Sequence, residues 1–435
     1  MLRKILTRES VLQDCKIFRM LAAQNPLHGS FHTPGHKVSG WDITELSYSD
    51  NLSCPQGCIA EAERDITEIL GSAKSFILTD GSTCGVLSIL HAAKALGVRK
   101  IALCEVAHKS VFNGCRLLGI TPLIYPQKKQ GGIPCGYTFS ELQQKFPSIF
   151  AEADGVFFTS PDYYGNVADL AAWRAYCDES GKLLLVDGAH GGHLHFDKEL
   201  YAGAYADFWV DGVHKSLPAL TQGAVVSAKT EVFAEKLRLA LDVFRTTSPS
   251  YPIMASVEYA VKFPRNKSLE EQAAAFEKSC KRVYFGGDWT KLCAVFGEYS
   301  FAAARDAESA GIYPEFCDGN VVMFYLSPAT TDADFQNLIA FLQEAFARYK
   351  ITSNEEENGI HYVPAPHLFS ESGETEWIEL SQATGKICAR MCGLFPPCTP
   401  LLYVGERIEK EKIELLNKAD NRFGLRDGKI EVYKK

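Results

Sequence analysis

The stretch Leu183-Leu184-Leu185-Val186-Asp187-Gly188-Ala189-His190 decides the fold class. Its aliphatic run has the length of a strand that is buried on both faces, and polar residues follow where such a strand ends. Similar apolar runs occur at 75–79, 100–104, 155–159, 207–211 and 224–227. Stretches of helical period lie between most of them, at 83–96, 110–118, 140–150 and 168–179. This alternation predicts an α/β fold with a mostly parallel sheet sandwiched by helices.

Distinctive polar residues gather at the carboxyl ends of these strands, which is where ligands bind in open parallel sheets. They are Asp80-Gly81-Ser82-Thr83, Ser160-Pro161-Asp162, Asp187-Gly188-Ala189-His190 and His214-Lys215. Because the carboxyl ends of parallel strands meet at one edge, we expect a single ligand site there.

The pattern divides the 435 residues into three parts. Residues 1–55 are irregular and predict an N-terminal arm, and residues 56–265 carry the strand–helix alternation of a large domain. Residues 266–435 predict linker helices and a smaller α+β C-terminal domain. In this last part we expect a strand at 321–326, a helix at 332–349, a polar loop at 354–359 and a short strand at 377–380.

Composition excludes several classes of protein. The chain has 45 Lys+Arg against 53 Asp+Glu, and a net charge of -8 argues against a basic nucleic-acid-binding surface. No apolar run approaches the roughly 20 residues of a membrane helix, and the N-terminus has too short an apolar run for a signal peptide. The 14 cysteines are scattered without a C-x-x-C pair, so we expect free thiols in a cytoplasmic protein.

Two residues of the predicted site have side chains with distinctive chemistry. Lys215 follows an apolar strand, where burial would lower its pKa and free the amine for a Schiff base; an exposed lysine is the alternative. Asp187 ends a buried strand, so it could face a cation such as a protonated pyridine nitrogen, or only cap the next turn. Neither residue alone decides between its two interpretations.

A second group of residues suits a phosphate and a flat ring. Gly81-Ser82-Thr83 offers hydroxyls and helix N-terminal amides, although an ordinary helix cap needs only the serine. The segment lacks the lysine and spacing of a P-loop, and no G-x-G-x-x-G occurs, so ATP and dinucleotides are disfavoured. His108 follows another strand and could stack on an aromatic cofactor or be an ordinary core histidine.

Three imidazoles fall within His190-Gly191-Gly192-His193-Leu194-His195. On a strand His193 and His195 would share one face, but too few acids or further histidines lie nearby to complete a metal shell. We therefore expect no metal, with His190 contacting a ring and His193 and His195 structural.

Together these motifs resemble the Orn/Lys/Arg decarboxylases in their short form, which lacks an N-terminal receiver-like domain. The matching segments are 31–37, 42–46, 76–85, 108–110, 160–165, 187–190, 214–223, 247–251 and 311–315. The resemblance implies an aspartate-aminotransferase-like large domain that binds pyridoxal 5′-phosphate (PLP), in a homodimer or higher homo-oligomer. It also implies decarboxylation of lysine, arginine or ornithine to an amine of polyamine biosynthesis.

The resemblance implies a role for each site residue. Lys215 would form the Schiff base, Asp187 would face the pyridine nitrogen, and His108 would stack on the ring. The remaining cofactor-binding residues would be Gly81, Ser82, Thr83, His190 and His214. Residues 31–37 or 248–251 would serve the neighbouring subunit.

The chain departs from the family pattern at three notable positions. Gly188 stands where the family has Glu, and Gly212 stands where it has Ser, so one phosphate-contacting hydroxyl is missing. Cys398 replaces a glycine in the motif at 395–400. These departures leave two alternatives open: an aminotransferase or lyase of the same fold, and a catalytically silent regulatory relative.

The acidic partner for a cationic substrate tip is not singled out by any motif. Glu374, Glu376 and Glu406 are candidates, and each could equally be a solvated surface residue. The substrate's identity therefore stays open among the basic amino acids.

Overall fold

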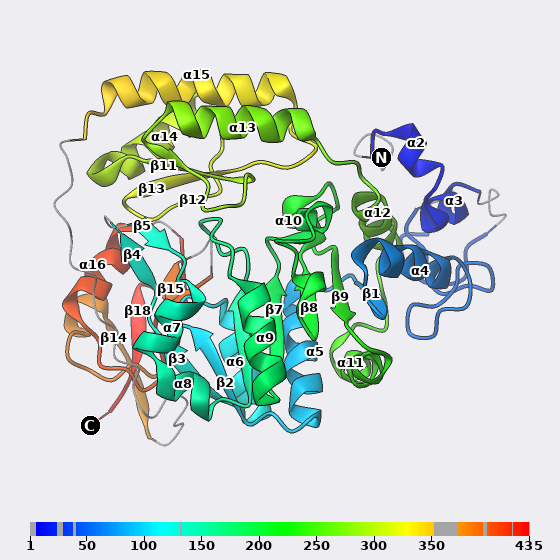
Figure 1. The fold of residues 1–435 in the computed structure, drawn as a ribbon, viewed down its shortest axis with the longest axis horizontal. Coiled ribbons are helices and arrows are strands. Elements are labelled where there is room, and N and C mark those ends of the chain that lie inside the picture. The colour runs from blue at the N-terminus through cyan, green and yellow to red at the C-terminus, as the bar shows by residue number, and fades with distance from the viewer. Residues whose placement is uncertain are drawn as a thin grey trace.

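The computed structural model describes residues 6–23, 29–37, 41–130, 133–351, 373–394, 398–419 and 421–434. Its centre is a seven-stranded sheet in the order β1-β9-β8-β7-β6-β2-β3 (Figure 1). The strands are β1 (Lys74–Leu78), β2 (Lys100–Cys104), β3 (Thr121–Tyr125), β6 (Gly155–Thr159), β7 (Leu183–Gly188), β8 (Phe208–Asp211) and β9 (Ala224–Ala228). β9 alone points opposite to the other six strands of this sheet, so the predicted mostly parallel sheet is confirmed.

Both faces of this sheet are covered, which is why its strands read as continuous apolar runs. In β7, Leu184 and Val186 enter one core while Leu185 enters the other. The Leu185 face packs against α5 (Gly81–Ala95), α6 (Lys109–Leu118) and α11 (Glu231–Phe244). The opposite face packs against α4 (Cys58–Leu70), α7 (Phe139–Lys145), α8 (Pro147–Glu152), α9 (Leu170–Ser180) and α12 (Tyr251–Val261).

Two differences from the expected elements have a clear physical cause. The helix expected at 140–150 is split into α7 and α8, because Pro147 begins α8 and cannot donate a backbone hydrogen bond. The unpredicted strand β3 contains Pro122, which is tolerated because β3 lies at the edge of the sheet.

A smaller antiparallel sheet forms a second layer above the large one in Figure 1, in the order β10-β11-β13-β12. Its strands are β10 (Val283–Tyr284), β11 (Lys291–Val295), β12 (Phe316–Cys317) and β13 (Val321–Tyr325). Helices α13 (Lys267–Ser279), α14 (Ser300–Ser309) and α15 (Asp332–Arg348) share its core. The one-turn helix α10 (Val213–Ser216) lies between the two layers (Figure 1).

The C-terminal residues form a further part with a core of its own. It contains β14 (Thr375–Glu379), β15 (Cys392–Leu394), β16 (Pro400–Leu402), α16 (Lys410–Lys418), β17 (Arg422–Phe423) and β18 (Lys429–Tyr433). The strand expected at 377–380 corresponds to β14, whereas the loop expected at 354–359 and residues 395–397 lie outside the described residues.

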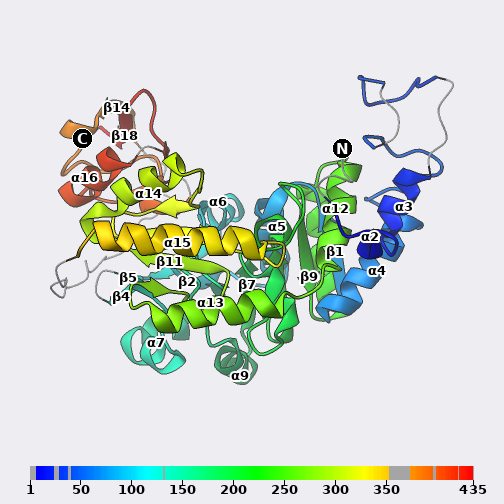
Figure 2. The same ribbon diagram turned by 90° about the horizontal axis from the view of Figure 1, so that it is seen from above.

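The N-terminal arm is partly helical rather than irregular throughout. It contains α2 (Glu9–Leu12) and α3 (Lys16–Ala22), at the opposite end of the molecule from the C-terminal part (Figure 2). Glu258 of α12 fixes α3, because its carboxylate accepts hydrogen bonds from the backbone N–H groups of Lys16 (2.7 Å) and Ile17 (2.9 Å). Among the residues described, no helix has both the length and the apolar character needed to cross a membrane.

Candidate active site

A cavity of about 410 Å³ opens at the carboxyl ends of the large sheet's strands. All eight predicted site residues line it: Gly81, Ser82, Thr83, His108, Asp187, His190, His214 and Lys215. Tyr163, Gln222, Glu315 and Cys398 are further lining residues. The structure thus brings together residues that are spread over more than a hundred positions of the sequence.

Lys215 extends into this cavity from α10, the single helical turn that follows β8. Its Nζ lies 3.1 Å from Nε2 of His190. Burial lowers the pKa of Lys215, and the opposing charge of Asp187 only partly offsets this effect. A lysine in these surroundings supplies a neutral amine more readily than an exposed one, which is what a Schiff base requires.

Asp187 ends β7 and is only 2% exposed. Its Oδ1 accepts a hydrogen bond from the backbone N–H of Ala189 at 3.1 Å. Burial raises the pKa of this carboxyl group, whereas the nearby charge of Lys215 lowers it. A cationic ring nitrogen in the cavity would favour the ionised carboxylate, so Asp187 is suited to that partner.

Two of the histidines are held as neutral rings. Burial lowers the pKa of His108 to about 3, and its Nδ1 accepts a hydrogen bond from the backbone N–H of Ser110 at 3.2 Å. Burial and then the charge of Lys215 lower the pKa of His190 well below its usual range. The Nδ1 of His190 is buried, and no described residue forms a hydrogen bond with it. Both flat, uncharged rings suit contact with an aromatic ligand.

His214 has a fixed orientation at the same cavity. Its backbone N–H and its Nδ1 both donate to the carbonyl oxygen of Gly223, at 3.0 and 2.9 Å. Burial lowers the pKa of His214. Since Nδ1 carries the proton, Nε2 of the neutral ring is an acceptor, and it would donate to a phosphate only when protonated.

The residues at the start of α5 fit a phosphate group. Gly81 has a φ of 74°, in the region that favours glycine. Its backbone N–H donates to the backbone carbonyl oxygen of Gln222. The Oγ of Ser82 is buried and has no hydrogen-bond partner in the described part of the chain. The first-turn amides of a helix lack intrahelical acceptors and favour anions. A phosphate at this end would satisfy these donors, so the chain's residues fit PLP.

The three departures from the family pattern differ in how much space and which backbone conformation the structure gives each residue. A Cβ on Gly212 would lie 2.3 Å from the carbonyl oxygen of Ala189 and 2.8 Å from Oγ of Ser82, so this backbone leaves no room for a serine. A Cβ on Gly188 would lie 3.0 Å from a carbonyl oxygen of β8. Cys398 is buried with a φ of 64°, a conformation that favours glycine.

The three acidic candidates for contact with a cationic substrate tip do not line the cavity. Glu374 accepts a hydrogen bond from Lys434, Glu376 lies on β14, and Glu406 pairs with Lys412. None of the three lines the cavity, whereas Glu315 does. Glu315 is exposed at the rim of the cavity, and within the part of the chain that the structure describes its carboxylate forms no ion pair. The matched segment 311–315 contained this residue, but nothing local in the sequence distinguished its carboxylate.

His193 and His195 lie on a 3₁₀ helix, η1 (Gly192–Phe196), rather than on a strand. The Nε2 of His193 donates to Asp288 at 2.8 Å, and the Nδ1 of His195 donates to the carbonyl oxygen of Gly192 at 2.7 Å. Within the described ranges, no group of three or more His, Cys, Asp or Glu side chains could hold a metal ion.

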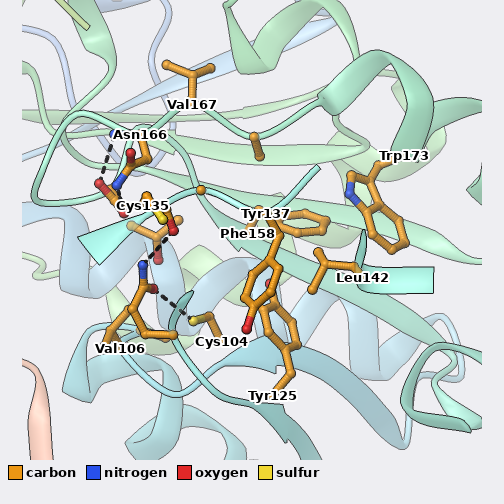
Figure 3. A pocket seen from close by; sticks show the side chains of 16 residues that line it. Cys104, Val106, Tyr125, Cys135, Tyr137, Leu142, Phe158, Asn166, Val167 and Trp173 are labelled. Atoms are coloured by element: carbon orange, nitrogen blue, oxygen red, sulfur yellow. Dashed lines mark hydrogen bonds between the residues drawn. The ribbon is translucent and has the colours of Figure 1, made fainter. Parts of the chain in front are cut away.

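A second, smaller cavity of about 70 Å³ lies beside strand β6 (Figure 3). The rings of Tyr125, Tyr137, Phe158 and Trp173 line its apolar part, and Cys104, Cys135 and Asn166 lie toward its polar end (Figure 3). Its volume is about one sixth of that of the cavity around Lys215. It contains none of the predicted site residues and is too small for PLP with a substrate.

Comparisons with known proteins agree with this geometry. Residues 21–281 match the family model described as Orn/Lys/Arg decarboxylase, major domain. An arginine decarboxylase of Bacillus anthracis is 25% identical over 454 residues, which cover 91% of this chain and 90% of the relative. The structure of the Escherichia coli constitutive lysine decarboxylase has a TM-score of 0.75 and 19% identity, covering 100% of this chain and 82% of that one.

A more distant likeness points to the same fold. Serine palmitoyltransferase of Sphingomonas wittichii has a TM-score of 0.56 and 15% identity, covering 79% of this chain and 85% of that one. The aspartate-aminotransferase-like fold and the PLP cofactor expected from the resemblance are therefore confirmed. Because the family model matches more than half of the chain, this protein belongs to the Orn/Lys/Arg decarboxylase family of PLP-dependent enzymes.

Proposed function

We propose that this enzyme decarboxylates a basic amino acid, arginine first, at the cavity around Lys215. The observation that carries the proposal is Glu315, a carboxylate without an ion-pair partner among the described residues, in the same cavity as the predicted Schiff-base lysine. A cationic side-chain tip would pair with it. Arginine is favoured because three Bacillus relatives that match about nine-tenths of the chain are named arginine decarboxylases.

Each residue of the cavity has a part in this proposal. PLP, when bound, supplies an electron sink for the pair released as the bond between Cα and the carboxylate breaks and CO₂ leaves. Lys215 binds the cofactor, Asp187 keeps its ring nitrogen protonated, and His108 covers one face of the ring. A proton must then return to Cα, and Lys215 or His190, with their nitrogen atoms 3.1 Å apart, would deliver it.

The phosphate end and the assembly complete the proposal. The Oγ of Ser82, which lacks a partner among the described residues, would bind the phosphate together with Thr83, while Gly81 allows close approach of the backbone. His214 would donate to the phosphate from Nε2 when its ring is protonated. We place the enzyme in the cytoplasm, since its cysteines are free thiols, and its amine product in polyamine biosynthesis. A homodimer is supported by the arm, where Phe31 is 99% exposed in the single chain and could meet a second copy.

The test is a comparison of substrates with the purified, PLP-loaded protein. Arginine, lysine and ornithine are supplied separately while CO₂ and the amine are measured, with Lys215→Ala as the control. We expect release from arginine at the highest kcat/KM and none from the variant. Release from lysine or ornithine alone would replace the proposed substrate. Keto-acid formation without CO₂ would indicate an aminotransferase, and no turnover of any amino acid would indicate a silent relative.

A further inference from the structure

A fully buried group of charges connects the small sheet to the loop that follows Asp187. Lys291, the first residue of β11, is 0% exposed. Its Nζ donates to Oδ2 of Asp288 at 2.5 Å, to Oγ1 of Thr290 at 2.9 Å and to the carbonyl oxygen of His190 at 2.6 Å. The same Nζ lies 4.5 Å from the ring centre of Tyr325. All three donor positions of the ammonium group are therefore used.

Asp288 links this lysine to a second point on the same loop. The carboxylate is 0% exposed, and its Oδ1 accepts from Nε2 of His193 at 2.8 Å. The backbone N–H of His193 in turn donates to Oγ of Ser216 at 3.2 Å. Ser216 is the residue directly after Lys215. The charge pair thus holds both the segment that carries His190 and the turn that carries Lys215.

We propose that Lys291 is a positioning residue, which fixes the His190 imidazole against the amine of Lys215 from the small domain. This inference rests on the proposed function of the Lys215 cavity. Lys291 does not line that cavity, so it acts through His190 and through Asp288 and His193. The hydroxyl of Tyr325 supports the same point, because it also donates to the carbonyl oxygen of His190, at 3.3 Å.

Removing Lys291 from this buried charge network would cost enough free energy to displace the loop that carries His190. Burying a charged pair costs solvation, and loss of one partner leaves the other uncompensated in the interior. Without Lys291, the His190 carbonyl oxygen would lose its charged hydrogen-bond donor and Asp288 would lose its ion-pair partner. The loop that follows Asp187 would then be free to shift. A misplacement of about 1 Å at reacting groups costs on the order of 100-fold in rate.

The test compares Lys291→Met with Lys262→Met in the full chain. Lys262 is a matched control, since its side chain is only 6% exposed and pairs with Asp14, Asp65 and Glu258. None of these four residues lines the cavity. We expect kcat of Lys291→Met to fall roughly 100-fold with KM changed less than about threefold. The visible absorbance of bound PLP and the rate at which apoprotein Lys215 takes up PLP should change too. Lys262→Met should lower only the thermal unfolding temperature.

Tyr325→Phe covers the case in which Lys291→Met does not fold. It removes one hydroxyl that donates to His190, so kcat and the PLP absorbance should shift in the same direction by a smaller amount. If Lys291→Met matches Lys262→Met in kcat and absorbance, the positioning role is wrong. It is also wrong if Lys291→Met is unfolded and Tyr325→Phe equals wild type. A wild-type protein that takes up no PLP would instead overturn the proposed function.

Discussion

Asp211, at the end of β8, gives the most quantitative prediction for this fold. The residue is 1% exposed, and its Oδ2 accepts from the hydroxyl of Tyr201 at 2.7 Å and from Nε1 of Trp209 at 3.1 Å. Among the residues that the structure describes, none forms a hydrogen bond with its Oδ1. Burial therefore raises the pKa of Asp211 from its ordinary 3.8 to about 7, although the two hydrogen bonds oppose the shift.

The sign of the effect on stability follows from this raised pKa. Below the unfolded pKa both states carry the proton, so nothing is lost. As the pH rises from about 4 to about 7, the unfolded chain releases the proton while the folded chain keeps it, so the free energy of unfolding falls. At about 1.4 kcal/mol for each tenfold change, the loss reaches about 4 kcal/mol above pH 7.

Asp211→Asn removes this loss and keeps an oxygen for Tyr201 and Trp209. We expect its free energy of unfolding, relative to wild type, to rise by about 3 kcal/mol between pH 5 and pH 8. Urea unfolding at both pH values measures the difference. A relative stability that is equal at the two pH values would show that the pKa of Asp211 is not raised in the folded protein.

Asp288→Asn is the control for this experiment. It makes the same substitution at a buried carboxyl group whose pKa is shifted in the opposite direction. Burial opposes ionisation of Asp288, but His193 and Lys291 lower its pKa overall. Losing one partner of such a pair costs about 3–5 kcal/mol. The control should therefore be destabilised at both pH values, whereas Asp211→Asn should be stabilised at the higher one.

Three further substitutions test the cavity. Glu315→Gln should raise the KM for arginine roughly tenfold with little change in kcat, since it removes about 1.5 kcal/mol of charge-assisted binding; an unchanged KM in steady-state kinetics would count against Glu315. Gly212→Ser should weaken PLP binding and lower the free energy of unfolding by about 1–3 kcal/mol, because its Cβ would meet Ala189. Tighter PLP binding by Gly212→Ser in a fluorescence titration would show that the backbone at position 212 has room for a serine side chain. Cys398→Val should be less stable than Cys398→Gly by about 1–2 kcal/mol, owing to the positive φ; equal denaturation midpoints would contradict this.

The strands and the ligand edge were predictable because their signals are local. Each buried strand, such as β7, is a short apolar run, and each polar residue of the edge follows such a run directly. Once strand direction is known, the carboxyl ends must meet, so Asp187 and Lys215 come to one cavity without knowledge of side-chain packing.

The contributions of the small domain could not be predicted, because they depend on contacts between distant segments. Lys291 meets the His190 carbonyl across 101 residues, and its local sequence does not distinguish it from a surface lysine. Glu315 reaches the cavity only because the small sheet packs over the large one. The acidic candidates chosen from the sequence lie in the C-terminal part, which has its own core away from the cavity.

Mapping the site of PLP attachment tests the central claim most directly. The protein is incubated with PLP, reduced with borohydride and digested, and the labelled peptide is identified by mass spectrometry. We expect one label, on Lys215, and none in Lys215→Ala. An unlabelled wild type, or a label that persists at another lysine in Lys215→Ala, would contradict it.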